Sequence, residues 1–173
     1  MLTMNGRTML VIGGARSGKS RHAQALAESC AGTLVFIATA QPFDDEMRDR
    51  IDRHRSDRGP RWRTVEAPRS LAAAVEQADR PDAVILVDCL TLWASNLLLA
   101  EEALDAPLAE LEHVLARGRG RIILVANEVG LGIVPDNALA RRFRDMAGTI
   151  NQRVAASVDR VHLVVAGIPL AIK

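Results

Sequence analysis

Eight residues near the start of the chain have the types and the spacing of a loop that binds phosphate groups. Gly13-Gly14-Ala15-Arg16-Ser17-Gly18-Lys19-Ser20 fits the pattern G-x4-G-K-[S/T], and it stands between a strand-like run and a helical one. The glycines let backbone N–H groups converge on phosphate oxygens, and the helix adds the positive end of its dipole. The motif predicts that Lys19 reaches the β- and γ-phosphates of a nucleoside triphosphate and that Ser20 binds Mg²⁺.

A second oxygen ligand for that metal is expected at the end of a neighbouring buried strand. The apolar run at residues 83–87 is followed directly by Asp88, which therefore becomes the candidate carboxylate. Asp is also a common helix cap, so the alternative is that Asp88 caps the helix predicted to begin near Leu90. We favour the metal role because a P-loop protein needs a carboxylate at this point.

His54 is the histidine best suited to chemistry. On the helix predicted over residues 44–57, Arg50 and His54 lie four residues apart, and Arg58 extends this stripe by four more if the helix runs that far. Cations one turn away disfavour imidazolium, which leaves a neutral ring nitrogen that can act as a nucleophile or a base. The alternative is a surface histidine whose neighbouring arginines pair with nearby acidic residues. His22 and His113 have weaker cases, and His162 lies in a late strand.

The elements that must position these residues alternate along the chain. Continuous apolar runs predict strands over residues 8–12, 33–38, 83–87, 121–126 and 160–165, with a weaker one over 62–65. Helical spacing covers residues 19–29, 44–57, 70–78, 90–99, 106–116 and 137–157. This order predicts an α/β fold of the P-loop NTPase type, a doubly wound, mostly parallel sheet flanked by helices. We expect residues 1–173 to form a single nucleotide-binding domain.

Composition narrows the possible partners and the compartment. With 49% apolar residues, 25% charged residues and a net charge of +1, the chain has no basic excess that would indicate nucleic acid or a membrane surface. The run at residues 83–100 contains Asp88 and several polar residues, which favours a buried strand and helix over a membrane span. Cys30 and Cys89 have no metal-type spacing, and reduced thiols indicate a cytoplasmic protein.

Together these segments resemble the bifunctional adenosylcobinamide kinase / adenosylcobinamide-phosphate guanylyltransferase family of cobalamin biosynthesis. The matching pieces are residues 13–21, 37–41, 44–47, 50–51, 54, 62–66, 127–135, 140–145 and 148–153. The run at residues 127–135, NEVGLGIVP, is far more specific than the phosphate-binding loop alone.

The resemblance implies two activities. The first is phosphorylation of the aminopropanol hydroxyl of adenosylcobinamide by ATP or GTP. The second is transfer of GMP from GTP to that phosphate, with release of pyrophosphate and formation of adenosylcobinamide-GDP. The family carries GMP on a histidine, and His54 is the matching residue, although Arg53 stands where some relatives have a second histidine.

The resemblance also implies the residues that bind the nucleotide and the metal. They are Gly13, Gly14, Ala15, Arg16, Ser17, Gly18, Lys19, Ser20, Ala38, Thr39, Ala40, Arg55, Ser56, Asp57, Arg58, Glu66 and Asp88, with Ser20 and Asp88 at Mg²⁺. A homo-oligomer, a trimer by family expectation, would bind the corrinoid in an apolar groove shared between subunits.

Two other functions remain possible from the sequence. A simple small-molecule kinase would use His54 only as a phosphate contact. A GTPase-like switch needs Asn-Lys-x-Asp after a late strand, and Asn127-Glu128-Val129-Gly130 lacks both the Lys and the Asp.

Overall fold

The computed structural model describes residues 4–41 and 59–173 of the chain, and within them a seven-stranded sheet forms the centre of the molecule. Its strands are β1 (Thr8–Gly13), β2 (Thr33–Ala38), β3 (Trp62–Glu66), β4 (Ala83–Asp88), β5 (Arg121–Asn127), β6 (Arg160–Val165) and β7 (Ile168–Ala171). They lie in the order β3-β2-β4-β5-β1-β6-β7, and β7 alone pairs antiparallel with its neighbour.

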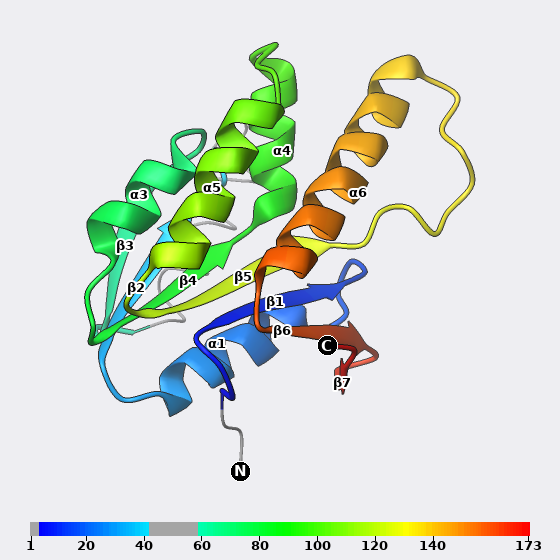
Figure 1. The fold of residues 1–173 in the computed structure, drawn as a ribbon. Coiled ribbons are helices and arrows are strands. Elements are labelled where there is room, and N and C mark those ends of the chain that lie inside the picture. Colours follow the sequence, from blue (N-terminus) through cyan, green and yellow to red (C-terminus); the bar gives the residue numbers. More distant parts are fainter. Residues whose placement is uncertain (1–3, 42–58) are drawn as a thin grey trace.

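The described helices lie on both faces of this sheet (Figure 1). They are α1 (Lys19–Ser29), α3 (Leu71–Ala78), α4 (Leu90–Leu99), α5 (Asp105–Arg117) and α6 (Ala138–Ser157). In Figure 1 α1 lies below the sheet, whereas the other four lie above it. The predicted α/β fold with a mostly parallel, doubly wound sheet is therefore confirmed.

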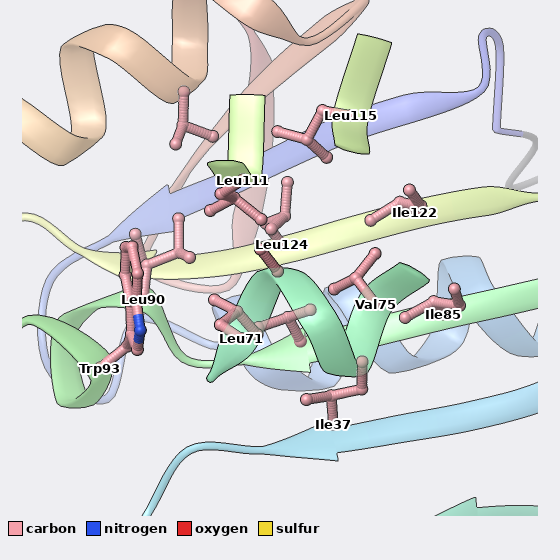
Figure 2. Close-up of a cluster of buried hydrophobic side chains, with 14 of the residues drawn as sticks. Ile37, Leu71, Val75, Ile85, Leu90, Trp93, Leu111, Leu115, Ile122 and Leu124 are labelled. Carbon is pink, nitrogen blue, oxygen red and sulfur yellow. The ribbon is translucent and has the colours of Figure 1, made fainter. Parts of the chain in front are cut away.

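Two clusters of buried side chains hold the layers together. Alternate residues of each strand face opposite helices, as Ile85 does toward α3–α6 and Val84 toward α1. Figure 2 shows the larger cluster, in which Leu111 and Leu115 of α5 lie over Ile122 and other sheet residues. Each fully buried aliphatic side chain contributes roughly 1.5–3 kcal/mol, so the sheet is a firm platform for the loops at its edge.

The strands predicted over 33–38 and 160–165 have the predicted bounds, and the other four end one residue later than predicted. The predicted helices over 19–29 and 90–99 also agree, while the one over 44–57 lies outside the described residues. Strand β7 was not predicted, because Ile168–Ala171 is short, contains Pro169 and is exposed along its whole length. A short segment that contains Pro has the sequence of a turn as much as that of an edge strand, so it does not by itself predict a strand.

Candidate functional site

The loop between β1 and α1 has the backbone of a phosphate cradle. Gly18 has φ of 93° and Arg16 has φ of 55°, so the chain turns sharply before α1 begins at Lys19. The Lys19 side chain is only 9% exposed, and its Nζ donates to the carbonyl oxygen of Gly14 at 3.1 Å. The lysine therefore folds back over the loop, which is the position it needs to reach a bound phosphate.

Segments on both sides brace this loop. The N–H of Gly167, in the turn between β6 and β7, donates to the Ser17 carbonyl at 2.8 Å, and the N–H of Glu128 donates to the Gly13 carbonyl at 3.0 Å. Within the described part of the chain, the buried hydroxyl of Ser17 has no hydrogen-bond partner. This hydroxyl lies inside the loop, close to the backbone of Gly13, so the loop is tightly packed there.

Replacement of Gly13 by Ala is expected to damage the cradle. A Cβ on Gly13 would lie 2.5 Å from the Val164 carbonyl oxygen and 2.7 Å from Ser17 Oγ, so backbone has to move. We expect a destabilisation of about 1–3 kcal/mol, as for an overpacked core, and at least a tenfold loss of nucleotide affinity because the loop amides would be displaced. Thermal unfolding and nucleotide titration measure both effects.

Gly14→Ala is the matched control, since a Cβ there meets nothing within 4 Å. If Gly13→Ala binds nucleotide as well as Gly14→Ala does, the close packing of this loop has no role in binding.

The sheet register brings most of the other predicted nucleotide contacts to one edge. Ala38 at the end of β2 pairs with Glu66 of β3 on one side and with Asp88 of β4 on the other. Gly13, at the start of the phosphate cradle, pairs with Asn127 at the end of β5. All these strands are parallel, so their carboxyl ends meet where ligands of open α/β sheets bind.

Asp88 does not cap α4, so that alternative is wrong. The cap is Cys89, whose sulfur accepts the N–H of Leu92 at 3.5 Å. Burial first and the charge of Asp88 second raise the pKa of the Cys89 thiol to about 11, while the charge of Lys19 opposes both. The carboxylate and the lysine thus both lie within electrostatic range of one thiol. With the Ser20 hydroxyl, Asp88 supplies the hard oxygen donors that Mg²⁺ prefers.

Thr39 has a different role from a nucleotide-binding side chain. It is 0% exposed, and its hydroxyl donates to the Cys89 carbonyl at 2.7 Å and accepts the Cys89 N–H at 2.8 Å. Its side chain is occupied within the protein, so a contact with nucleotide at this turn has to come from backbone or from Ala38 and Ala40, both half-buried.

The proposed nucleophile and several predicted contacts lie outside the described residues. These are His54, Arg55, Ser56, Asp57 and Arg58.

A pair of histidines that the sequence did not connect lies beside the cradle. Nε2 of His22, on α1, is 3.0 Å from Nδ1 of His162, on β6. Burial lowers the pKa of both rings, and the charge of the partner ring lowers that of His22 further, as the charge of Arg160 does for His162. Because one ring must accept the hydrogen bond, at least one stays neutral.

This pair is expected to make the protein less stable below pH 7. A lowered folded-state pKa means that the unfolded chain binds protons more readily, so stability is present above the unfolded value of about 6.5 and is lost as pH falls toward the folded value. In the double variant His22→Gln, His162→Gln the fall in melting temperature between pH 7.5 and pH 5 should be smaller than in the unsubstituted protein. If the melting temperature falls equally in the two proteins, the lowered pKa of the histidine pair does not cause the pH dependence.

The loop at residues 127–135 is anchored at its start and exposed beyond it. The N–H of Asn127 donates to Thr91 Oγ1 at 2.7 Å, and its carbonyl accepts from Asn151 Nδ2 at 3.2 Å. Farther along, Leu131 is 91% exposed and Ile133 is 97% exposed. Exposed aliphatic side chains on an anchored loop indicate a contact with an apolar ligand or another protein surface.

Sequence reasoning missed one buried polar group at this edge, Asn96 of α4. Its side-chain amide donates to the carbonyl oxygens of Thr39 and Pro68 at 2.7 and 2.8 Å. The available signal was a lone amide within the apolar run at residues 90–99, but its partners are distant in sequence.

Two features are absent from residues 4–41 and 59–173. They contain no group of three or more His, Cys, Asp and Glu side chains placed to hold a metal ion. None of their helices has both the length and the apolar character needed to cross a membrane.

Comparison with known proteins identifies relatives along nearly the whole chain. A family model described as cobinamide kinase / cobinamide phosphate guanyltransferase matches residues 9–172. The bifunctional adenosylcobalamin biosynthesis protein CobU of Salmonella typhimurium is 46% identical over 180 residues, covering 95% of this chain and 99% of the relative. The bifunctional protein CobP of Pseudomonas aeruginosa is 47% identical over 166 residues, covering 95% and 96%.

Solved structures of lower identity share the fold. An ATPase of a bacterial type III secretion system has a TM-score of 0.55 at 14% identity, and the match covers 96% of this chain but only 57% of that one. The P4 protein of bacteriophage phi13 has a TM-score of 0.51 at 15% identity, covering 95% and 53%. This chain thus spans little more than half the length of either protein, and the likeness supports the P-loop fold alone.

Proposed function

The chain belongs to the cobinamide kinase / cobinamide phosphate guanyltransferase family, and from this membership and the site we infer that it carries out both reactions. It phosphorylates adenosylcobinamide and then transfers GMP from GTP to the adenosylcobinamide phosphate, giving adenosylcobinamide-GDP. The structural observation that carries the proposal is the braced phosphate cradle, with Lys19 Nζ folded onto Gly14 at an edge that also holds Asp88.

In the kinase step, the aminopropanol hydroxyl of the corrinoid attacks the γ-phosphorus of ATP or GTP. A new P–O bond forms, the bond between the γ-phosphorus and its bridging oxygen breaks, and the hydroxyl proton leaves. The loop amides and Lys19 hold the triphosphate in line and offset the charge of the leaving nucleoside diphosphate.

In the transfer step, a neutral ring nitrogen of His54 attacks the α-phosphorus of GTP. A P–N bond forms and pyrophosphate leaves with the electrons of the broken P–O bond. A phosphate oxygen of adenosylcobinamide phosphate then attacks the same phosphorus, the P–N bond breaks, and the imidazole is regenerated. One difficult displacement becomes two easier ones, because a phosphoramidate is a labile intermediate.

Mg²⁺ is proposed as the metal that accompanies the nucleotide. It would be held by Ser20 and Asp88 together with phosphate oxygens, and it would neutralise charge on the triphosphate. The register that ends β4 at Asp88 supports this assignment.

The corrinoid is proposed to bind against exposed apolar side chains near the loop at residues 127–135, in a homo-oligomer whose subunits share the groove. Support comes from the exposed Leu131 and Ile133, and from the half-exposed Leu139 and Leu99 beside a hollow between α4 and α6. A substrate as large as a corrin needs more apolar surface than one small pocket provides.

The proposal is tested by incubating the protein with adenosylcobinamide, GTP and Mg²⁺ and following the corrinoids by liquid chromatography and mass spectrometry. Adenosylcobinamide phosphate should appear first and adenosylcobinamide-GDP second, with one pyrophosphate released for each GDP adduct. A reaction that stops at the phosphate would identify a simple kinase. Hydrolysis of GTP without corrinoid, and with no adduct, would identify a GTPase.

A further inference from the structure

Helix α4 contains a buried amide whose two hydrogens both tie loops to the helix. Asn96 is 5% exposed, and its Nδ2 donates to the Thr39 carbonyl at 2.7 Å and to the Pro68 carbonyl at 2.8 Å. An Asn side chain has two N–H donors, so both are used. These carbonyls belong to the segments that follow β2 and β3, which are also joined by the hydrogen bond from the Ala67 N–H to the Ala38 carbonyl at 2.8 Å.

Thr39 is also hydrogen-bonded to the end of β4 and to the residue that follows it. The Thr39 hydroxyl bonds both the carbonyl and the N–H of Cys89, the residue directly after Asp88. The Thr39 N–H also donates to the Asp88 carbonyl at 3.4 Å. Asn96, Thr39 and Cys89 therefore fix the segments after β2, β3 and β4 against one another at the nucleotide edge of the sheet.

Core packing does not require an amide at this position. The neighbours Leu97 and Leu98 on α4 are buried and apolar, and leucine has the branched shape of asparagine with two larger methyl groups in place of the amide oxygen and nitrogen. Asparagine is costly to bury unless all its polar atoms are satisfied. Its presence is explained by the two loop carbonyls to which it donates.

We infer that Asn96 is a positioning residue for guanylyl transfer. It fixes the turn at Thr39 and the segment that follows Glu66 of β3 relative to Asp88. The inference rests on the proposed function and adds to it a residue that touches neither nucleotide nor corrinoid. A displacement of about 1 Å at a reacting group can cost about a hundredfold in rate. Loss of these hydrogen bonds should therefore slow the transfer far more than it weakens GTP binding, most of which comes from the phosphate cradle at residues 13–20.

The test compares Asn96→Leu and Asn96→Asp with the unsubstituted protein. Both substitutions remove the N–H donors. Asn96→Asp keeps the size and shape of the side chain, so it serves as the test if Asn96→Leu fails to fold. The rate of covalent GMP labelling from GTP at saturation should fall roughly ten- to a hundredfold, while the KM for GTP stays within about threefold. Thr33→Val is the matched control, because it removes a hydrogen bond, Thr33 Oγ1 to Asp82 at 2.9 Å, from the opposite end of β2.

The outcomes separate the two claims. Normal labelling by folded Asn96 variants would overturn this inference and leave the proposed function intact. If the labelling rate of the Asn96 variants falls only in proportion to their folded fraction, Asn96 has a structural role alone and the inference is overturned. The same holds if the labelling rate falls as far in Thr33→Val as in the Asn96 variants. An unsubstituted protein that takes no GMP label would overturn the proposed function and this inference with it.

Discussion

His54→Ala is expected to lose guanylyl transfer by at least about a thousandfold, as removal of a nucleophile does, while phosphorylation of adenosylcobinamide stays within about threefold. Alanine leaves no nitrogen to attack the α-phosphorus, whereas the γ-phosphoryl transfer uses the cradle and not the imidazole. The measurement is the accumulation of corrinoid products over time. The variant should convert adenosylcobinamide to its phosphate and stop there.

His113→Ala is the control for this experiment. His113 is an exposed histidine on α5, so its loss tests whether removal of any imidazole disturbs the reaction. Both activities should be normal in that variant. Equal loss of the two activities in His54→Ala would show that residue 54 serves the nucleotide site in general, and persistence of the GDP adduct would remove its role as nucleophile.

Lys19→Met is expected to lose both activities together, each by roughly a hundred- to a thousandfold, the usual cost of losing one group that stabilises transition-state charge. The methionine fills the nearly buried site of Lys19 but brings no charge to the phosphates. Because the account assigns one cradle to both reactions, the phosphorylation and transfer rates should fall in parallel. Steady-state rates of each step, started from the appropriate corrinoid, measure the two effects separately.

Lys19→Arg is the graded comparison, since it keeps the charge but not the compact ammonium. Lys19→Arg should recover part of the phosphorylation rate and part of the transfer rate, and both should recover by the same factor. A Lys19→Met protein that is folded by circular dichroism and keeps one of the two activities would show that the reactions use separate nucleotide sites.

The strands and the cradle could be predicted because local pattern determines them. Strands β1, β2, β4 and β5 are largely apolar runs buried between two layers, and Gly13 to Ser20 is a motif whose chemistry is contained in eight consecutive residues. The sheet order, with β5 between β1 and β4, follows from packing of the whole chain and was not predicted.

The missed features depend on partners that are far apart in sequence. Asn96 meets Thr39 and Pro68, and His22 meets His162 across 140 positions, so no local spacing reveals either contact. The sequence also left open Asp88 as the cap of α4, but the helix begins at Leu90, as predicted, and the residue directly before it, Cys89, caps it with its thiol.

The central claim, that a neutral imidazole at position 54 receives GMP from a nucleotide held in the cradle, is tested most directly by locating the label. The unsubstituted protein is incubated with GTP and Mg²⁺ in the absence of corrinoid, digested under mildly alkaline conditions that preserve a phosphoramidate, and mapped by mass spectrometry. The account predicts the mass of one GMP on the peptide that contains His54, with the fragment ions placing it on that histidine. GMP found instead on Lys19, His22 or any other residue, with the peptide of His54 unmodified, would contradict it.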